Sequence, residues 1–222
     1  RDGGIDEART EAILLARHIL RVDRSWLIAY SDREFPELAG EPLLDRRLAH
    51  EPLAYILGWR EFFGRSFGVT PAVLIPRHET ELLVEEALKR FPPEEPIRVL
   101  DIGTGSGCIA ITLKLERPAW EVTAVDISEE ALAIASANAR FHESPIKLIH
   151  SDLFEGILGE EFDLIVSNPP YIGDQEPLPP MVKDHEPPLA LFAGPDGFAV
   201  YDRIADEAGS YLPDGGVLVL DE

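Results

Sequence analysis

The sequence has little cysteine and no long apolar run, and each absence excludes a class of protein. Its single cysteine, Cys108, excludes a disulfide framework and a thiolate metal cage and fits a reducing compartment. No apolar run approaches the roughly 18 to 20 residues that cross a bilayer, and the N-terminus is neither a signal h-region nor a transit peptide. We therefore expect a soluble cytoplasmic protein with no membrane partner, and 222 residues are enough for a substantial core.

Positive charge is also scarce, above all in the second part of the chain. Residues 1–90 hold 13 Lys and Arg against 16 Asp and Glu, a net charge of −3, while residues 91–222 hold 7 against 25, a net charge of −18. A protein that binds nucleic acid normally presents a basic face to the phosphates. The charge balance therefore argues against direct contact with DNA or RNA, and most of the acidic residues are expected simply to keep the protein soluble.

Metal-binding and acyl-transfer motifs are missing as well. Asp184, His185 and Glu186 stand together in a proline-rich stretch, where such a tripeptide is more often solvated, and no H-E-x-x-H or paired Cys/His spacing accompanies them. There is no G-x-S-x-G elbow. We expect no metal, and we expect Cys108 to be a small buried residue, although its place at a helix start would also suit a thiol of lowered pKa.

The patterns that are present divide the chain into a helical part and an α/β part. Apolar residues recur at helical spacing between residues 5 and 50, and aromatic and β-branched residues around Gly64 and Gly68 predict a hairpin. From Pro96 onward, strands rich in Val, Ile and Leu alternate with helices, which indicates a parallel sheet covered on both faces. The expected domains are a helical domain over residues 1–57, a β-hairpin linker over 58–75 and an α/β domain over 76–222. Residues 173–188 are expected to form an irregular loop that faces the substrate.

A glycine-rich loop over residues 101–107 (Asp-Ile-Gly-Thr-Gly-Ser-Gly) is expected to hold the cofactor. Its three glycines remove every Cβ that would keep a ligand from the backbone. The Lys-Ser/Thr pair of a Walker loop is missing, and G-x-G-x-G differs from the dinucleotide spacing. Asp101 precedes the loop and Asp126 and Asp152 end the next two strands, so three carboxylates should flank one pocket. Such a pocket suits the cationic S-adenosylmethionine better than a pyrophosphate, although Asp126 or Asp152 judged singly could equally be a helix cap or turn residue.

Residues 168–171 (Asn-Pro-Pro-Tyr), directly after a predicted strand, are the most specific feature of the sequence. The two prolines fix the backbone and donate no amide hydrogen. The side-chain oxygen of Asn168 and the carbonyl of Pro169 thus become two fixed acceptors for both hydrogens of one NH2 group, with Tyr171 as a flat wall beside it. An amide-like nitrogen has a delocalised lone pair, so aiming it at a methyl group matters more than a strong base. A plain turn is the alternative interpretation, and the position beside the glycine-loop strand makes it less favoured.

Taken together, these motifs resemble the family of N5-glutamine methyltransferases that modify peptide chain release factors, often called the HemK or PrmC family. The resemblance covers nearly the whole chain, and it also includes residues 51–58, 73–77, 79–81, 186–187 and 194–197. It implies a small N-terminal helical domain that helps to recognise the release factor, a hairpin linker and a Rossmann-like methyltransferase domain. It further implies that the methyl group of S-adenosylmethionine passes to the glutamine of a Gly-Gly-Gln tripeptide, which leaves S-adenosyl-L-homocysteine.

The resemblance also assigns site residues. Asn168 and Pro169 are implied to be catalytic, and they bind the glutamine amide together with Pro170 and Tyr171. The residues implied to contact the cofactor are Gly103, Thr104, Gly105, Ser106, Gly107, Asp126, Asp152, Leu153 and Asn168. The family continues through a further helix and two strands after the last residue of this sequence, so the chain is expected to be trimmed, with these C-terminal strands missing.

Three other readings remain open. A nucleic-acid methyltransferase acting on an exocyclic amine faces the same chemical problem and could use the same Asn-Pro-Pro-Tyr turn, with the flipped base stacked on Tyr171. An enzyme that methylates a glutamine of a ribosomal protein would have the same site chemistry. A non-catalytic module that retains the cofactor fold is a third reading, and the presence of both the glycine loop and the residue 168–171 turn argues against it.

Overall fold

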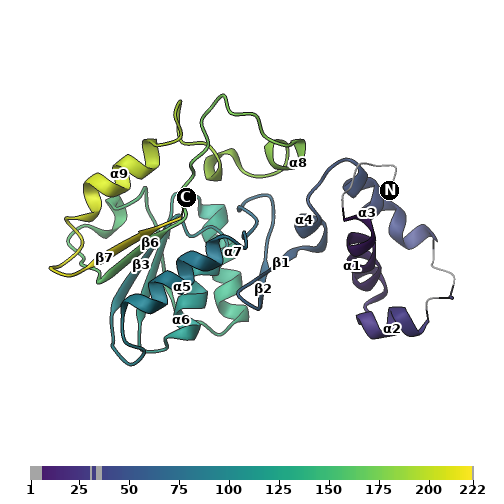
Figure 1. Cartoon of the computed structure of the whole chain (residues 1–222), viewed down its shortest axis with the longest axis horizontal. Helices are drawn as coiled ribbons and strands as arrows, with labels where there is room; N and C mark the ends of the chain where they lie inside the picture. The colour runs from purple at the N-terminus through teal and green to yellow at the C-terminus, as the bar shows by residue number, and fades with distance from the viewer. Residues whose placement is uncertain (1–6, 31, 34–36, 222) are drawn as a thin grey trace. The chain divides into compact units, whose positions relative to one another are not determined.

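The computed structural model describes residues 7–30, 32–33 and 37–221, and the chain forms two compact units. One unit consists of Arg1–Gly58 with Pro179–His185, and the other of Trp59–Leu178 with Glu186–Glu222. Both units can be followed in Figure 1. No helix within the described ranges is both long and apolar enough to span a bilayer.

The first unit is helical, as the periodicity predicts. It contains α1 (Ala8–Leu20), α2 (Arg24–Ala29), α3 (Glu37–Leu48), α4 (Leu53–Leu57) and the short α8 (Pro180–Lys183). Asp23 begins α2 as an N-cap, because its carboxylate accepts a hydrogen bond from the backbone N–H of Trp26 at 2.7 Å. The buried Arg47 of α3 makes two hydrogen bonds, at 2.6 and 3.0 Å, to the carboxylate of Glu11 in α1. This bidentate pair joins the two longest helices of the unit.

The predicted hairpin is formed by β1 (Trp59–Phe62) and β2 (Arg65–Gly68), which pair antiparallel. Phe63 and Gly64 between them have φ angles of 51° and 70°, as a tight two-residue hairpin turn requires. The backbone N–H of Phe63 donates to Glu81 at 2.9 Å. Phe62 and Phe67 are fully buried in the main core of the α/β unit. Phe62 and Phe67 therefore anchor the hairpin in the core of that unit.

The second unit is built on a sheet of five parallel strands in the order β5-β4-β3-β6-β7. The strands are β3 (Arg98–Ile102), β4 (Glu121–Asp126), β5 (Lys147–His150), β6 (Leu164–Ser167) and β7 (Val217–Leu220). The chain runs outward from β3 to β5 and then returns to place β6 on the other side of β3. The crevice beyond the carboxyl ends of β3 and β6 is thus the switch point where such sheets bind ligands.

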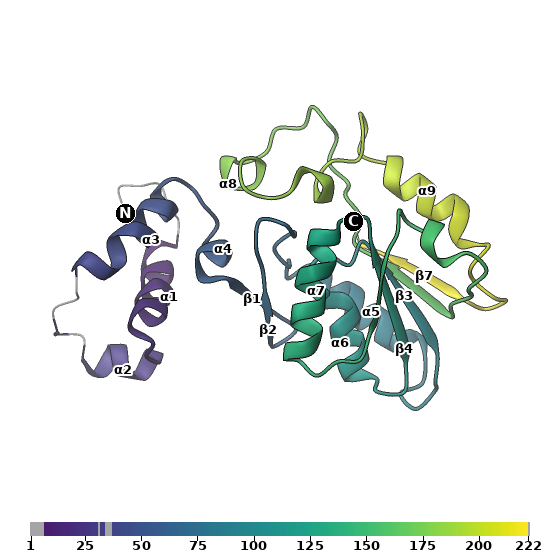
Figure 2. The same cartoon turned by 180° about the vertical axis from the view of Figure 1, so that it is seen from behind.

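Both faces of the sheet are covered, as the continuous apolar strands predict. On one face lie α5 (Thr80–Arg90), α6 (Cys108–Glu116) and α7 (Glu129–Phe141), packed on Val99, Val122 and Leu164. Across the sheet, α9 (Ala199–Ala208) and the 3-10 turn η1 (Glu155–Ile157) pack on Leu100 and Ile165. Figures 1 and 2 show α9 and α5 separated by the sheet. The α/β fold class inferred from the sequence is confirmed.

The loop over residues 173–188, which was expected to be irregular, contains short helical elements. Four of its residues form one helical turn, α8 (Pro180–Lys183), which begins with a proline at its first position. Pro188 begins a second short element, the 3-10 turn η2 (Pro188–Ala190). Proline favours both starts, because its fixed φ suits a first helical residue and its missing N–H would have no partner there. The prolines therefore begin short helices here as well as interrupting longer ones.

Candidate active site

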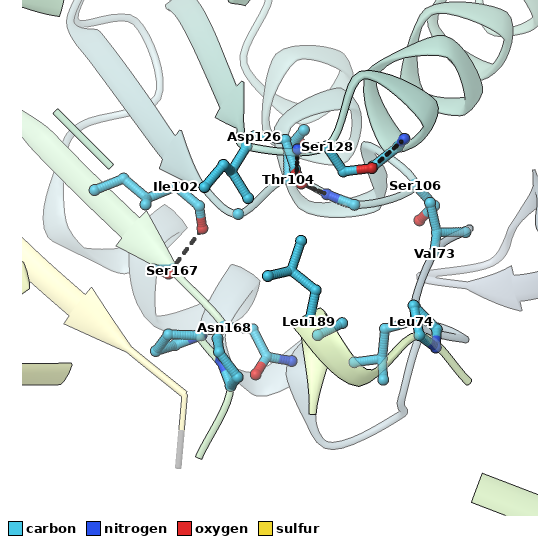
Figure 3. Close-up of a pocket in the computed structure, with 18 of the residues that line it drawn as sticks. Val73, Leu74, Ile102, Thr104, Ser106, Asp126, Ser128, Ser167, Asn168 and Leu189 are labelled. Atoms are coloured by element: carbon cyan, nitrogen blue, oxygen red, sulfur yellow. Dashed lines mark hydrogen bonds between the residues drawn. The ribbon is translucent and has the colours of Figure 1, made fainter. Parts of the chain in front are cut away.

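A cavity of about 440 Å³ opens at the carboxyl ends of β3, β4 and β6, entirely within the α/β unit. Its volume is in the range of small-molecule and cofactor sites. Six segments border it: the glycine loop, the end of β4 with the start of α7, residues 151–153, residues 167–170, and two mainly apolar stretches at residues 71–77 and 187–190. Thr80 of α5 and Val200, Arg203 and Ile204 of α9 complete the lining. Figure 3 shows Asp126, Thr104 and Ser128 on one side of this space and Asn168 on the other, with Leu74 and Leu189 nearby.

Two of the three loop glycines leave open space for a ligand. Gly103 and Gly105 line the cavity with φ angles of 70° and 55°, and a Cβ added to either would meet no atom within 4 Å. Gly107 differs from the sequence-based expectation. Its Cβ would lie 2.9 Å from Ile111 and 3.2 Å from Ala135, and it is not among the lining residues. Gly107 is thus required for close packing of α6 against α7, which short sequence spacing cannot distinguish from ligand contact.

Asp101 also differs from expectation, because it does not border the cavity. It is fully buried beneath the loop, where its Oδ2 accepts hydrogen bonds from the hydroxyl of Thr104 at 2.7 Å and from the backbone N–H of Ala110 at 3.2 Å. Its Oδ1 has no hydrogen-bond partner in the part of the chain that the structure describes. Burial raises the pKa of Asp101 to about 7, and the nearby charge of Asp126 adds to the effect. Asp101 is therefore not among the carboxylates that line the cavity, which are Asp126, Asp152 and the exposed Glu130 in the first turn of α7.

The raised pKa of Asp101 gives a testable pH dependence of stability. The folded chain binds this proton more tightly than an unfolded chain, in which the pKa is near 3.8. Stability is therefore lost as the pH rises from about 4 to about 7, and the full penalty persists above pH 7. In thermal unfolding followed by circular dichroism, the Tm of Asp101→Asn should fall less than that of the wild type between about pH 5 and pH 8. Parallel curves for the two proteins would contradict this assignment.

The carboxylate of Asp126 is held by a backbone N–H of the glycine-rich loop. Its Oδ2 accepts from the backbone N–H of Gly105 at 2.8 Å and its Oδ1 from that of Ser128 at 2.9 Å. Burial raises its pKa, and these backbone hydrogen bonds oppose the shift. An ionised carboxylate has about four acceptor positions, so two remain for a ligand. The arrangement suits recognition of a pair of hydroxyl groups, as the sequence predicts for a ribose.

Asp152 and Leu153 line the cavity on the side of β5, and Ser151 joins them. Asp152 has a partner that sequence reasoning missed: Arg203 of α9 donates to its Oδ1 at 3.0 Å and lines the same cavity. The two residues are 51 positions apart in the chain. Arg203 uses one acceptor position of this carboxylate, so Asp152 retains others for a hydrogen bond from a ligand amino group.

The turn over residues 168–170 forms the opposite wall. The buried Ser167 hydroxyl donates to the carbonyl oxygen of Ile102 at 2.7 Å, which fixes the end of β6 beside β3. Asn168 is half-buried, and its Nδ2 donates to the hydroxyl oxygen of Thr80 at 2.9 Å. Asn168, Pro169 and Pro170 all line the cavity. The structure thus brings the predicted acceptor group and the glycine loop to one space.

Tyr171 is the member of the turn that the cavity leaves out. It is 53% exposed and is not among the lining residues. Its backbone is instead held against Gly197, where an added Cβ would lie 2.4 Å from the carbonyl oxygen of Tyr171 and where φ is 81°. Any other residue at position 197 would push the turn away. A wall formed by the Tyr171 ring therefore stays a prediction, and it concerns a substrate that approaches from outside the cavity.

Glu186 corrects the expectation that residues 184–186 are solvated. Its side chain is only 2% exposed and accepts hydrogen bonds from the backbone N–H of Ile75 at 3.2 Å and from the guanidinium of Arg77 at 2.6 Å. The partners are 111 and 109 positions away, so no local pattern reveals them. This carboxylate joins the two apolar stretches that border the cavity.

Among the described residues there is no group of three or more His, Cys, Asp and Glu side chains that could hold a metal ion.

Cys108 begins α6 next to the glycine loop and is buried, as predicted. Burial raises the pKa of its thiol to about 12, and the hydroxyl of Ser106 opposes this shift. The thiol is therefore protonated at neutral pH and packs as a small apolar group rather than acting as a nucleophile.

Asn138 connects the hairpin to the cofactor loop. Its Oδ1 accepts from the backbone N–H of Gly68 at 2.8 Å, and its Nδ2 donates to the carbonyl oxygens of Gly68 and Ser106 at 3.0 and 2.8 Å. The residue is 4% exposed. Since one amide satisfies three backbone groups, the positions of β2, α7 and the glycine loop depend on one another. Sequence reasoning missed this residue as well.

The chain matches two known families and closely similar proteins. Residues 1–58 match the PrmC N-terminal domain and residues 78–183 the Methyltransferase small domain. The chain is 46% identical over 219 residues to a release factor glutamine methyltransferase of Koribacter versatilis, which covers 96% of this chain and 78% of that protein. It is 46% identical over 223 residues to the protein of the same name from Geobacter sulfurreducens, with 98% and 78% covered.

The fold itself also has solved counterparts. A methyltransferase from Pyrococcus furiosus superposes with a TM-score of 0.53 at 22% identity, over 81% of this chain and 78% of that one, which is evidence for the fold alone. The sequence matches show the family as well as the fold, because their identity of 46% is far above 22% and they extend over both units. The chain belongs to the release factor glutamine methyltransferase family.

Proposed function

We propose that this chain transfers the methyl group of S-adenosylmethionine to the side-chain amide nitrogen of the glutamine in the Gly-Gly-Gln tripeptide of a peptide chain release factor. One observation carries the proposal. The amide-binding turn at Asn168 and Pro169 and the open glycine loop with Asp126 face each other across a single cavity. A methyl donor and an amide held at these two walls would be brought together without further movement of the chain.

The residues around the cavity fit S-adenosylmethionine. Gly103 and Gly105 leave room for its methionine part, the free acceptor positions of Asp126 suit the ribose hydroxyls, and Asp152 with Leu153 border the place for the adenine. Thr104 and Ser106 shape the same loop, and Thr104 is held by its hydrogen bond to Asp101. When bound, this cofactor supplies an electrophilic methyl group on a positively charged sulfur. The lining carboxylates of Asp126, Glu130 and Asp152 suit that charge better than they suit a pyrophosphate.

Asn168 and Pro169 would orient the acceptor. With Nδ2 of Asn168 directed to Thr80, the Oδ1 atom is the part of the amide left to accept from a substrate. The carbonyl oxygen of Pro169 is the second acceptor, and the fixed φ angles of Pro169 and Pro170 hold the backbone that carries it. Two hydrogen bonds to one NH2 group fix the direction of the nitrogen. We assign no general base, because the nitrogen becomes acidic once it carries the methyl group and can lose its proton to water.

The charge of the chain supports a protein substrate over the nucleic-acid alternative. An exocyclic amine of DNA or RNA could bind the same turn, but residues 91–222, which hold most of the site, carry a net charge of −18. We therefore propose no direct contact with nucleic acid and no membrane partner. A release factor acts in translation termination, so we expect the reaction to take place in the cytoplasm. A glutamine of a ribosomal protein would satisfy the same chemistry and is the alternative to test.

Radiolabelled S-adenosylmethionine distinguishes these substrates. The protein would be incubated with its matching release factor, with the same factor carrying Gly-Gly-Ala in place of Gly-Gly-Gln, with ribosomal proteins, and with total RNA and DNA. We expect label only in the unaltered release factor, and mass spectrometry of the labelled peptide should place one added methyl group on the glutamine. Label in nucleic acid or in a ribosomal protein, with none in the release factor, would refute the proposal.

A further inference from the structure

Thr80 contacts the proposed acceptor residue from a distant part of the chain. It is the first residue of α5, is 3% exposed, and lies with its Oγ1 at 2.9 Å from the Nδ2 atom of Asn168, 88 positions later in the sequence. It also lines the cavity. Neither the glycine loop nor the turn over residues 168–171 points to this residue from the sequence.

An asparagine at this position needs such a partner. Its carboxamide carries an acceptor at one end and two donors at the other, and a half-turn about the last side-chain bond exchanges them. Only one of the two orientations presents an acceptor to the NH2 group of a substrate. In the described part of the chain, Thr80 is the only hydrogen-bond partner of the Asn168 amide. A threonine hydroxyl can accept or donate, and here its oxygen accepts from Nδ2, so this hydrogen bond holds the amide with Oδ1 directed away from Thr80.

The hydroxyl of Thr80 is itself held in place. Leu83, Val84 and Ala87 of the same helix are buried in the main core, so α5 cannot shift without disturbing that core. The neighbouring residue, Glu81, accepts a hydrogen bond from Phe63 in the turn of the hairpin. The β-branched side chain of threonine also has few rotamers in a helix. The acceptor atom for Asn168 thus sits on a helix whose buried face is part of the main core.

We propose that Thr80 is a positioning residue for methyl transfer, which holds the Asn168 amide with its oxygen toward the substrate nitrogen. This inference rests on the proposed function of Asn168. It assigns to Thr80 no contact with the reacting atoms. The effect of Thr80 on methyl transfer is transmitted through Asn168 alone. It should therefore disappear when Asn168 is replaced, and it should be visible in the NMR signals of the Asn168 side-chain amide.

Two substitutions at position 80 separate the hydroxyl from the shape of the side chain. Thr80→Val keeps the shape and removes the hydrogen bond, and we expect kcat with the release factor to fall by about 10- to 100-fold, since small misplacements at a reacting centre have effects of this order. The KM for S-adenosylmethionine should stay within about threefold. Thr80→Ser keeps the hydroxyl and should restore most of kcat. In an Asn168→Ala background, Thr80→Val should have no further effect on kcat.

Thr112 supplies the matched control. It is a fully buried threonine in the neighbouring helix α6, and its Oγ1 has no hydrogen-bond partner among the described residues. Thr112→Val makes the same chemical change in the same helical layer without touching Asn168. We expect its kcat to equal that of the wild type within about twofold, because no hydrogen bond is lost.

A second readout needs neither cofactor nor release factor. The side-chain NH2 signals of Asn168 in a 15N-labelled sample can be identified by their absence from the spectrum of Asn168→Ala. We expect Thr80→Val to shift these signals and Thr112→Val to leave them in place. If Thr80→Val has wild-type kcat, or if its effect adds to that of Asn168→Ala, the inference about Thr80 is wrong. If the wild type fails to methylate the release factor, the proposed function fails instead, and the Asn168 signals still report whether Thr80 orients the amide.

Discussion

Asn168→Ala should lower kcat for release-factor methylation by about 10²- to 10³-fold, the loss typical for a group aimed at the reacting centre. The substitution removes the side-chain oxygen that accepts one of the two amide hydrogens and leaves the carbonyl of Pro169 as a single acceptor. A nitrogen held by one hydrogen bond can rotate, so its lone pair is rarely aligned with the methyl group. The affinity for S-adenosylmethionine should change far less, because the glycine loop and Asp126 remain in place.

Rapid-quench single-turnover kinetics and calorimetric titration of the cofactor would measure these two quantities separately. Asn168→Asp is the informative companion, because it retains an acceptor oxygen at nearly the same place, replaces the donor to Thr80 with an oxygen and adds a negative charge. We expect its kcat to lie between those of the wild type and Asn168→Ala. A single-turnover rate for Asn168→Ala within threefold of the wild type would exclude Asn168 as the residue that orients the amide.

Asn138→Ala should cost about 3 kcal/mol or more in the free energy of unfolding, among the largest effects expected of a single substitution here. The change leaves the N–H and carbonyl of Gly68 and the carbonyl of Ser106 without their partner, in a buried place. Each orphaned buried group costs about 1 to 3 kcal/mol, less whatever water can recover. Urea unfolding followed by fluorescence and circular dichroism would measure the loss.

Ser106 belongs to the glycine loop, so Asn138→Ala should also weaken cofactor binding. If binding must then re-order the loop at a cost of about 1.4 kcal/mol, the affinity for the cofactor falls about tenfold. Ser136→Ala on the same helix is the matched control. Among the described residues, the Ser136 hydroxyl has one hydrogen bond, which it accepts from the exposed Arg140. The free energy of unfolding of Ser136→Ala should therefore differ from that of the wild type by less than about 0.5 kcal/mol. Equal stability of the two variants would show that the Asn138 contacts are replaced by water at little cost.

Much of the fold was predictable because it follows from local patterns in the sequence, such as apolar periodicity and turn residues. Unbroken apolar strands alternating with helices predict a parallel sheet covered on both faces, and the structure has five such strands with both faces covered. The hairpin was predictable from its aromatic residues and Gly64, whose positive φ completes the turn. The short helix α8 was not, because a single turn that begins with proline has too few residues to show a period.

The candidate site was predictable where the chemistry lies in one short segment. The glycine loop, Asp126 and the turn after β6 each follow directly from a strand end, and parallel strands bring their carboxyl ends to the same edge. The departures concern direction. Asp101 is buried beneath the loop and a Cβ at Gly107 would face α7, and a linear sequence does not say to which side a residue faces. The wall expected of the Tyr171 ring stays a prediction, since this residue does not line the cavity.

The sequence by itself determined the class of fold, the alternation of strands and helices, the family, and three of the segments that meet at the proposed site, namely the glycine loop, the end of β4 and the turn after β6, because each of these depends on periodicity or on a contiguous motif. Only the tertiary structure decided which residues hold that site in shape. Thr80 and Asn168 are 88 positions apart, Asn138 and Gly68 are 70, and Arg77 and Glu186 are 109. Hydrogen bonds over such separations exist only once the chain has packed, since their partners are set by distance in space rather than by spacing along the chain.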